Sequence, residues 1–315
     1  MKRLMISIIV LIMIITLSSC NNRTKKSNNV IDNDVIGSED EIIIPREEVS
    51  EHRPPLLDSR NFIDERLFIK FINESTLLSE DDNIIAGIIP HHDVASNYVA
   101  SLYRTIANNK QPEVIILIGP NHPGTGPRFQ IGNYDFNTRA GVIRSDSNIL
   151  NSLANAPDIN YAIKEVFEKE HSVGLHMNYI KQYFDKAKVV PITIGETRND
   201  EGILDVAKAI IEEIKDKDFI VIASIDFSHY LTLEEANEKD EITRKIIEDS
   251  DVGRMISLSN DHIDSPSSYA LLIEILNGLG IDYTCSINGH DNSANIIGDE
   301  TIQETTSYFS VSYIM

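Results

Sequence analysis

The sequence predicts one α/β domain in which helices cover both faces of a mostly parallel or mixed central sheet, an α/β/α sandwich. Short apolar runs, which are typical of buried strands, recur from residue 84 to residue 313. Segments with apolar side chains at helical spacing separate most of these runs. No second linker and no internal repeat interrupts this stretch, so we expect a single folded unit.

The first three elements are predicted to be a strand, a helix and a strand. Residues 84–89 and 114–118 are apolar runs, and residues 95–108 carry apolar side chains at every third or fourth position. A strand–helix–strand unit of about 30 residues favours parallel pairing, because the crossover returns the chain to the same end of the sheet.

The remaining elements are predicted from the same two patterns. Residues 188–194 and 219–224 are further apolar runs, and residues 283–287 form a β-like segment. Residues 307–313 alternate polar and apolar side chains as strands do, so we expect both of these later segments to close the sheet. We expect residues 288–292 to form a surface loop. The helical or partly helical segments that we expect are 144–154, 180–186, 203–215, 233–249 and 267–277.

The N-terminus has the pattern of a secretory signal. Lys2 and Arg3 precede an apolar segment, residues 4–17, and two serines follow just before Cys20. The apolar segment has 14 residues, fewer than the roughly 20 that a membrane-spanning helix needs. Small residues directly before a cysteine resemble the lipobox of bacterial lipoproteins, which implies cleavage before Cys20 and a lipid on its sulfur. An uncleaved anchor helix is the alternative.

This interpretation divides the chain into a lipoprotein signal peptide (1–19), a polar, disordered tether (20–55) and the α/β domain (56–315). It predicts an extracytoplasmic protein anchored to the cell membrane by lipid at Cys20. The formal net charge of −21 argues against nucleic acid as a partner and against direct contact with anionic headgroups. With Cys20 lipidated, Cys285 is the only other cysteine and cannot form an intramolecular disulfide, so we expect it to be a buried thiol.

Histidines follow three of the apolar runs. His91 comes after the first run, His122 after the second, and Asp226 and His229 after the run at 219–224. Polar groups beyond the carboxyl ends of strands meet at one edge of an open α/β sheet. Neutral imidazoles bind metals, and a histidine beside a carboxylate suits proton transfer. Each histidine taken alone could equally be an exposed loop residue, and Asp226 could simply cap a helical turn that begins at Phe227.

Further polar residues are candidates for supporting roles. Glu170, His171 and His92 could orient the ligands from outside, although Ser172 capping a helix would explain the region around Glu170 equally well. Asp264 could be a metal ligand, or a cap of the helix that follows it. We rank His176, His262, His290 and Asp291 lower, as structural or surface residues. The glycine-rich run 119–126 lacks the order of a phosphate loop and the lysine that follows one.

Four motifs together resemble the Memo-like family, which includes the AmmeMemoRadiSam system protein B group. They are Pro90-His91, Gly119-Pro120-Asn121-His122, Glu170-His171-Ser172 and Asp226-Phe227-Ser228-His229. The resemblance covers about residues 56–315 and includes the closing segment from Asn292 to Ser312. It implies a fold like that of the class III extradiol dioxygenases, which hold Fe(II) with two histidines and a carboxylate.

The resemblance also implies roles for individual residues. His91 and His122 match the two ligand histidines, and Asp226 and His229 match the family's aspartate and its acid–base histidine. The family has a cysteine as third ligand, whereas Asp264 is the nearest candidate here. Two histidines and one carboxylate suit Fe(II), while a thiolate would favour other metals, such as Cu or Zn.

The leading functional interpretation is therefore a membrane-anchored metal-binding protein with a dioxygenase-type site for a small molecule. The alternative is a non-catalytic lipoprotein that binds a ligand or peptide in the same cleft. A hydrolase that uses His229 with a serine is a third possibility, but no G-x-S-x-G motif is present.

Overall fold

The computed structural model describes residues 53–80 and 82–315, which form one compact unit. The predicted signal peptide, Cys20 and nearly all of the predicted tether lie outside these residues. Within the described ranges, no helix is both long and apolar enough to cross a membrane.

A single mixed sheet forms the centre of the molecule. Its strands are β1 (Leu56–Asp58), β2 (Ile84–Ile89), β3 (Val114–Pro120), β4 (Phe129–Ile131), β5 (Asp135–Thr138), β6 (Gly141–Ser145), β7 (Ile159–Tyr161), β8 (Lys188–Ile194), β9 (Phe219–Ser224), β10 (His229–Leu231), β11 (Thr284–Asn292) and β12 (Thr305–Ile314). The main order is β1-β5-β6-β8-β3-β9-β2-β12-β10, with β11 paired to β12 and β4 paired to β7 and β8. Strands β6, β8, β3, β9 and β2 are parallel, and β12 is antiparallel to β2.

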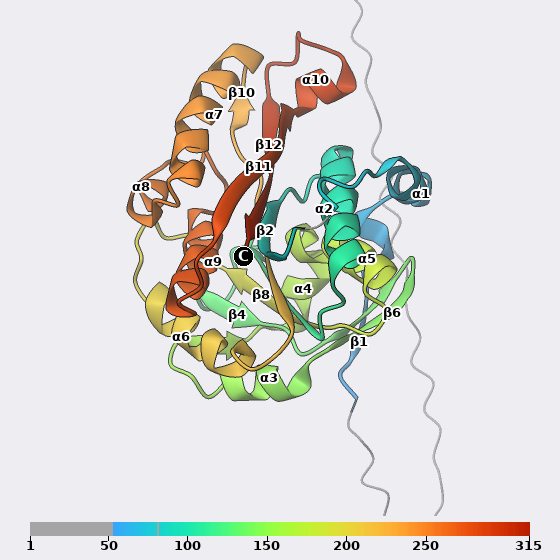
Figure 1. Cartoon of the computed structure of the whole chain (residues 1–315), viewed down its shortest axis with the longest axis vertical. Coiled ribbons are helices and arrows are strands. Elements are labelled where there is room, and N and C mark those ends of the chain that lie inside the picture. The colour runs from blue at the N-terminus through green and yellow to red at the C-terminus, as the bar shows by residue number, and fades with distance from the viewer. Residues whose placement is uncertain (1–52, 81) are drawn as a thin grey trace, which may run out of the picture. The chain divides into compact units, whose positions relative to one another are not determined.

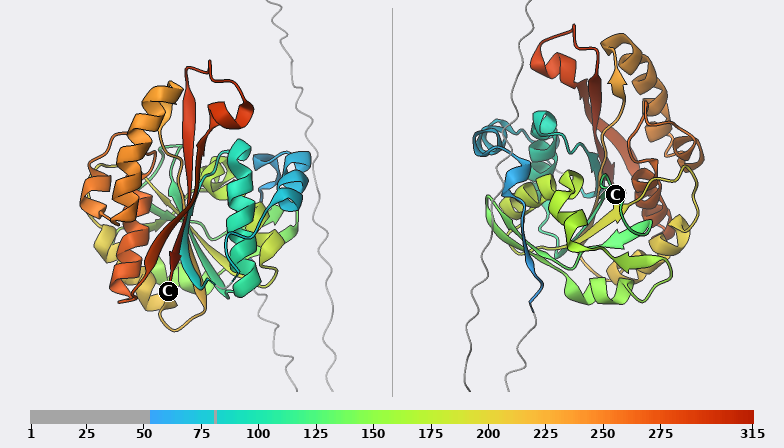
Figure 2. Two further views of the ribbon diagram at one scale, coloured as in Figure 1. Left: turned by 45° about the horizontal axis from the view of Figure 1, so that its top comes forward. Right: turned by 180° about the vertical axis from the view of Figure 1, so that it is seen from behind.

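Helices cover both faces of this sheet, as predicted (Figures 1 and 2). They are α1 (Glu65–Glu74), α2 (Ser96–Asn109), α3 (Ser147–Leu153), α4 (Lys164–Lys169), α5 (His171–Tyr183), α6 (Ile203–Ile214), α7 (Leu233–Glu248), α8 (Val252–Ile256), α9 (Pro266–Gly278) and α10 (Ser293–Ile297). One apolar cluster lies under α3 and α6–α9, and a second lies under α1, α2, α4 and α5. Alternate residues of β3 enter the two clusters: Ile116 and Ile118 the first, Ile115 and Leu117 the second.

Three predicted strands have the expected bounds, and two predictions in the C-terminal region are wrong. Residues 288–292 belong to strand β11 rather than to a loop, because their backbone pairs with β12 as far as Asn292 opposite Ser307. Polar side chains are tolerated there because this strand is only half-buried. Cys285 on the same strand is likewise half-buried rather than buried, and its partial burial raises the pKa of its thiol to about 11.

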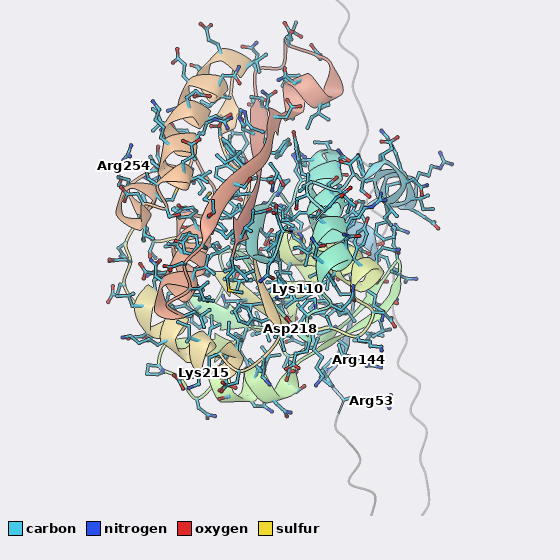
Figure 3. The ribbon with its side chains drawn as sticks, in the orientation of Figure 1. Arg53, Lys110, Arg144, Lys215, Asp218 and Arg254 are labelled. Atoms are coloured by element: carbon cyan, nitrogen blue, oxygen red, sulfur yellow. The ribbon has the colours of Figure 1, made fainter. Side chains whose placement is uncertain are left out.

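An ion pair and several hydrogen bonds stabilise the amino edge of the sheet, which is the edge at which the parallel strands begin. Lys110, just beyond α2, lies 3.0 Å from a carboxylate oxygen of Asp218 and donates a hydrogen bond to the backbone carbonyl of Phe219. Figure 3 labels Lys110 and Asp218, which lie next to each other. The backbone of Asp218 in turn accepts from the amide of Glu113, just before β3. These contacts join the start of β9 to the turn between α2 and β3.

Candidate metal centre

The carboxyl ends of three neighbouring strands bring the predicted residues together. In the sheet, β9 lies between β2 and β3 and is parallel to both. His91 follows β2, His122 follows β3 and Asp226 follows β9. The ring centroids of His91 and His122 are 5.2 Å apart, although 31 positions separate the two residues in the sequence. The sheet topology, rather than sequence proximity, therefore creates the cluster.

His91 lies at the centre of this cluster and is 3% exposed. Its Nε2 is 3.1 Å from Oδ2 of Asp264 and 3.7 Å from Oδ2 of Asp226. The backbone amide of His91 donates to Oδ1 of Asp226 at 3.0 Å. Burial alone would lower the pKa of the imidazole, but the two carboxylates outweigh burial and raise the pKa to about 9. A metal that binds Nε2 must therefore displace a proton at neutral pH.

Glu170 holds His122 from the opposite side. Its Oε1 accepts from Nδ1 of His122 and its Oε2 accepts from the backbone amide of His122, both at 2.7 Å. Glu170 is also the N-cap of α5, where it accepts from the amide of Ser172. Burial would raise the pKa of the Glu170 carboxyl, but its bonds to His122 and Ser172 hold the pKa below the usual value. A carboxylate on Nδ1 leaves Nε2 of His122 as the nitrogen that is free to bind a metal.

Close packing fixes the turn that carries His122. A Cβ on Gly119 would lie only 2.5 Å from the hydroxyl oxygen of Ser172. The absence of a side chain at Gly119 thus lets the end of β3 lie against the first turn of α5. Ser172 does not cap α5 with its side chain. Its hydroxyl donates to the carbonyl of Pro120, across the same contact.

Asp264 completes the cluster from a different part of the chain. An isolated β-bridge pairs Phe227 with Ile263, and the amide of Asp264 donates to the carbonyl of Asp226. The side chain of Asp264 is 12% exposed. Although an imidazole nitrogen lies 3.1 Å away, both carboxylate oxygens are buried with no aligned hydrogen-bond donor among the described residues. Ser265, not Asp264, caps helix α9.

The charges around Asp264 keep it ionised. Burial would raise the pKa of its carboxyl, but the positive character of His91, His229 and His122 outweighs burial and lowers the pKa below the usual value. Its Oδ2 is 3.1 Å from Nε2 of His91 and 3.9 Å from Nε2 of His122. Two ligands that each lie about 2 Å from one ion are roughly 3–3.5 Å apart. The three groups are thus close to the spacing that a bound divalent metal requires.

His171 lies beside His91 and His122, with ring centroids 5.0 Å and 4.2 Å away, and is itself a candidate metal-binding residue. One nitrogen from each of His91, His122 and His171 can be chosen so that all lie within 4.8 Å of one another, so these three residues could hold a metal. However, the rings of His122 and His171 are stacked, with centroids 4.2 Å apart and 27° between their planes. A metal binds in the plane of an imidazole at about 2 Å, so a stacked pair of rings is a less favourable pair of ligands for one ion than two rings that face it edge-on. Asp264 lies 3.9 Å from Nε2 of His122, so the structure offers both His171 and Asp264 as a third group beside His91 and His122.

The other predicted residues lie around the cluster with different partners. His229 begins strand β10 rather than a helical turn, because Ser228 and its neighbours pair with β12. It lies near enough to Asp264 to help lower the pKa of that carboxyl, and its Nδ1 is buried without a partner among the described residues. Asp226 hydrogen-bonds to the backbone of His91. His92 is exposed and pairs with the hydroxyl of Tyr308 at 2.6 Å.

Two groups beside the site were missed by the sequence reasoning. Glu196, two residues beyond β8, accepts from the hydroxyls of Ser265 and Ser267, and burial is the main cause that raises the pKa of its carboxyl to about 7. Ser224, the last residue of β9, bonds to Nδ1 of His91. Glu196 and Ser224 both follow or end predicted strands, which is the signal that selected the histidines.

Comparisons with known proteins agree with the resemblance in the sequence. The model of the family described as Memo-like protein matches residues 61–311. A MEMO1 family protein from Methanobrevibacter smithii is 29% identical over 226 residues, which cover 70% of this chain and 80% of that protein. A MEMO1 family protein from Thermococcus onnurineus is 32% identical over 51% of this chain and 58% of its own length. The crystal structure of an uncharacterized protein, JW3007, from Escherichia coli K12 is a distant likeness, with a TM-score of 0.44 and 11% identity over 74% of this chain and all of that one. Because the family model spans most of the sequence, the chain belongs to the Memo-like protein family.

Proposed function

We propose that the protein binds Fe(II) through His91, His122 and Asp264, and that this centre serves dioxygenase-type chemistry on a small molecule. One observation gives the main support for a metal site. A buried carboxylate without aligned donors lies 3.1 Å and 3.9 Å from two imidazole nitrogens. Such a carboxylate is costly to bury unless a cation occupies its lone pairs. Two histidines and one carboxylate are a ligand set that suits Fe(II) and leaves positions open.

The proposed chemistry assigns a task to each surrounding residue. Bound Fe(II) would supply open positions for O₂ and for an oxygen-rich or aromatic substrate. His229 accepts and returns a substrate proton, because it lies near Asp264 and its Nδ1 has no partner among the described residues. Glu170 keeps the proton of His122 on Nδ1. Asp226 holds the backbone of His91 in place.

Replacing the carboxylate tests the proposal most directly. Asp264→Ala should abolish tight Fe(II) binding under anaerobic conditions, measured by competition with a chelator. Asp264→Cys should keep a site but shift its preference towards Zn or Cu, because a thiolate is softer than a carboxylate. Asp261→Ala is the matched control, since Asp261 lies in the same loop but forms an ion pair with Lys239 on the surface.

The outcomes test first whether Asp264 is a ligand, and then whether the protein is a metal-binding protein or a non-catalytic binding protein. Unchanged Fe(II) affinity in Asp264→Ala would reject Asp264 as a ligand. A wild-type protein that takes up no Fe(II), Zn or Cu would reject the metal centre and favour the non-catalytic binding protein. Oxygen consumption with catechol-type compounds, lost in His229→Gln while Fe(II) affinity is kept, would support dioxygenase-type chemistry.

We also propose that lipid on Cys20 anchors the domain to the outer face of the cell membrane. The basic start, the short apolar segment and the small residues before Cys20 support this proposal. Incorporation of a labelled fatty acid into the full chain, lost in Cys20→Ser, would support it. Full incorporation into the Cys20→Ser variant would overturn it.

A further inference from the structure

A chain of four buried polar side chains leads from the metal centre into the protein interior. The Nδ1 of His91 is 3.0 Å from the hydroxyl of Ser224, and that hydroxyl is 3.1 Å from Nε2 of His176. The Nδ1 of His176 is in turn 3.1 Å from the hydroxyl of Tyr103. Tyr103, His176 and Ser224 are 0% exposed. Burying so many polar atoms is costly unless they are paired, so the order of their hydrogen bonds is strongly constrained.

The hydroxyl of Ser224 determines that order. It carries one hydrogen, and its two partners among the described residues are both imidazole nitrogens, one on His91 and one on His176. The hydroxyl can satisfy its hydrogen only if one of these nitrogens accepts it. The proton positions on His91 and His176 are therefore linked through Ser224.

A metal bound to Nε2 of His91 fixes which group donates and which accepts in every hydrogen bond from His91 to Tyr103. That nitrogen then uses its lone pair for the metal, so the ring proton stays on Nδ1 and is donated to Ser224. Ser224 must donate to Nε2 of His176, and His176 must carry its own proton on Nδ1 and donate it to the oxygen of Tyr103. His176 stays neutral, because burial is the main cause that lowers the pKa of its imidazole to about 3.

We propose that His176, acting through Ser224, is a positioning residue that keeps the ring proton of His91 on Nδ1 and so presents Nε2 to the metal. This inference rests on the proposed metal site. His176 is a neutral acceptor, in contrast to the carboxylate of Glu170 behind His122. His91 already lies between Asp226 and Asp264. A third carboxylate would favour the doubly protonated ring, which competes with the metal.

Two variants of His176 separate an acceptor role from a packing role. His176→Leu fills similar space without an acceptor and should weaken Zn(II) binding by about ten- to a hundredfold, the usual effect of losing a group behind a ligand. His176→Gln offers a side-chain oxygen to Ser224 and should restore most of the affinity. The control is Asn178→Leu on the same helix, whose buried amide bonds to Ser59 and Arg139 and not to the chain of four residues. This control should lose stability but not affinity.

The proton positions can also be read in the wild-type protein, which does not depend on how any variant folds. With ¹⁵N-labelled histidine and Zn(II) bound, NMR should show His91 and His176 both protonated at Nδ1. A His176 protonated at Nε2 in the Zn(II)-loaded protein, or equal Zn(II) affinity in wild type and folded His176→Leu, would overturn the inference. A wild-type protein that does not bind Zn(II) or Fe(II) at all would instead reject the proposed metal site.

Discussion

Both edges of the central sheet carry pairs of oppositely charged side chains, but the pairs at the carboxyl edge are more buried than the pair at the amino edge. At the carboxyl edge, His91 faces two carboxylates and His122 is held by Glu170, whose side chain is 0% exposed. At the amino edge, Lys110 pairs with Asp218, whose side chain is 53% exposed. Solvent-exposed pairs contribute little to stability, because water already screens each charge. Buried pairs interact strongly and depend on every partner being present.

This contrast singles out the carboxyl edge as the candidate functional site. Burial and neighbouring charge move the pKa of several groups at the carboxyl edge in opposite directions. The carboxylates beside His91 raise its pKa to about 9, whereas burial is the main cause that lowers the pKa of His171 to about 4. Such separated values are typical of functional sites. Substitutions at one edge at a time test this contrast.

Removing a ligand histidine should have the largest effect. His122→Ala takes away one of the two imidazoles that face Asp264 and leaves Glu170 buried without its partner. We expect Fe(II) or Zn(II) affinity to fall by more than about a hundredfold, beyond the usual effect of losing a group behind a ligand. Chelator competition measures this loss. His262→Ala, which changes a half-buried histidine next to α7, should leave affinity unchanged, and an equal loss there would contradict a specific role for His122.

The strands that build the carboxyl edge could be predicted because they are continuous apolar runs. β2, β8 and β9 are largely or wholly buried, so their sequences contain little else, and their ends are marked by the first polar residues. The convergence of His91, His122 and Asp226 follows from parallel pairing together with the place of β9 between β2 and β3, an order that the sequence does not show. The short strands β1, β4, β5, β6, β7 and β10 were missed, since three to five residues give no clear period.

Other features of the site could not be predicted because they depend on side-chain contacts in three dimensions. The double use of Glu170, as cap of α5 and partner of His122, requires the turn after β3 to lie against the helix. The stacking of His171 on His122 follows from the same contact. His176 was ranked low as a structural residue, and although it is fully buried, its link to His91 through Ser224 has no signal in the sequence.

Removing one charge behind His122 should have the next largest effect. Glu170→Gln keeps the size of the side chain but replaces the carboxylate that accepts from Nδ1 and from two backbone amides. We expect metal affinity to fall about ten- to a hundredfold and the free energy of unfolding to fall by roughly 1–3 kcal/mol, because charged hydrogen bonds at a helix start are lost. Metal titration and urea denaturation measure the two effects. Glu165→Gln in the first turn of α4 is the control. Full metal affinity in Glu170→Gln would show that His122 needs no carboxylate.

The raised pKa of His91 predicts a pH dependence for the metal-free protein. Because the folded pKa of about 9 lies above the usual value near 6.5, this group stabilises the fold fully below pH ~6.5, and the contribution is lost as pH rises towards 9. The loss is on the order of 2–3 kcal/mol. Urea denaturation of chelator-treated protein should show it, and His91→Gln should remove it. Metal affinity should rise over the same range, since one fewer proton must be displaced. A metal-free stability that is flat from pH 6.5 to 9 would contradict the proposed burial of a charged His91.

The smallest effect is expected at the amino edge. Lys110→Ala removes an ion pair with Asp218 and one hydrogen bond to the backbone carbonyl of Phe219. The pair is largely exposed on the Asp218 side, so the free energy of unfolding should fall by no more than about 1 kcal/mol. Strand β9 connects this edge to Ser224 and Asp226. A shift of the whole strand would therefore move side chains at the proposed metal site. We expect no such shift, since the pairing of β9 with β2 and β3 along its length fixes its register. A metal affinity that changes more than about threefold in Lys110→Ala would show that the two edges are coupled through β9, and the contrast between them would then be one of degree.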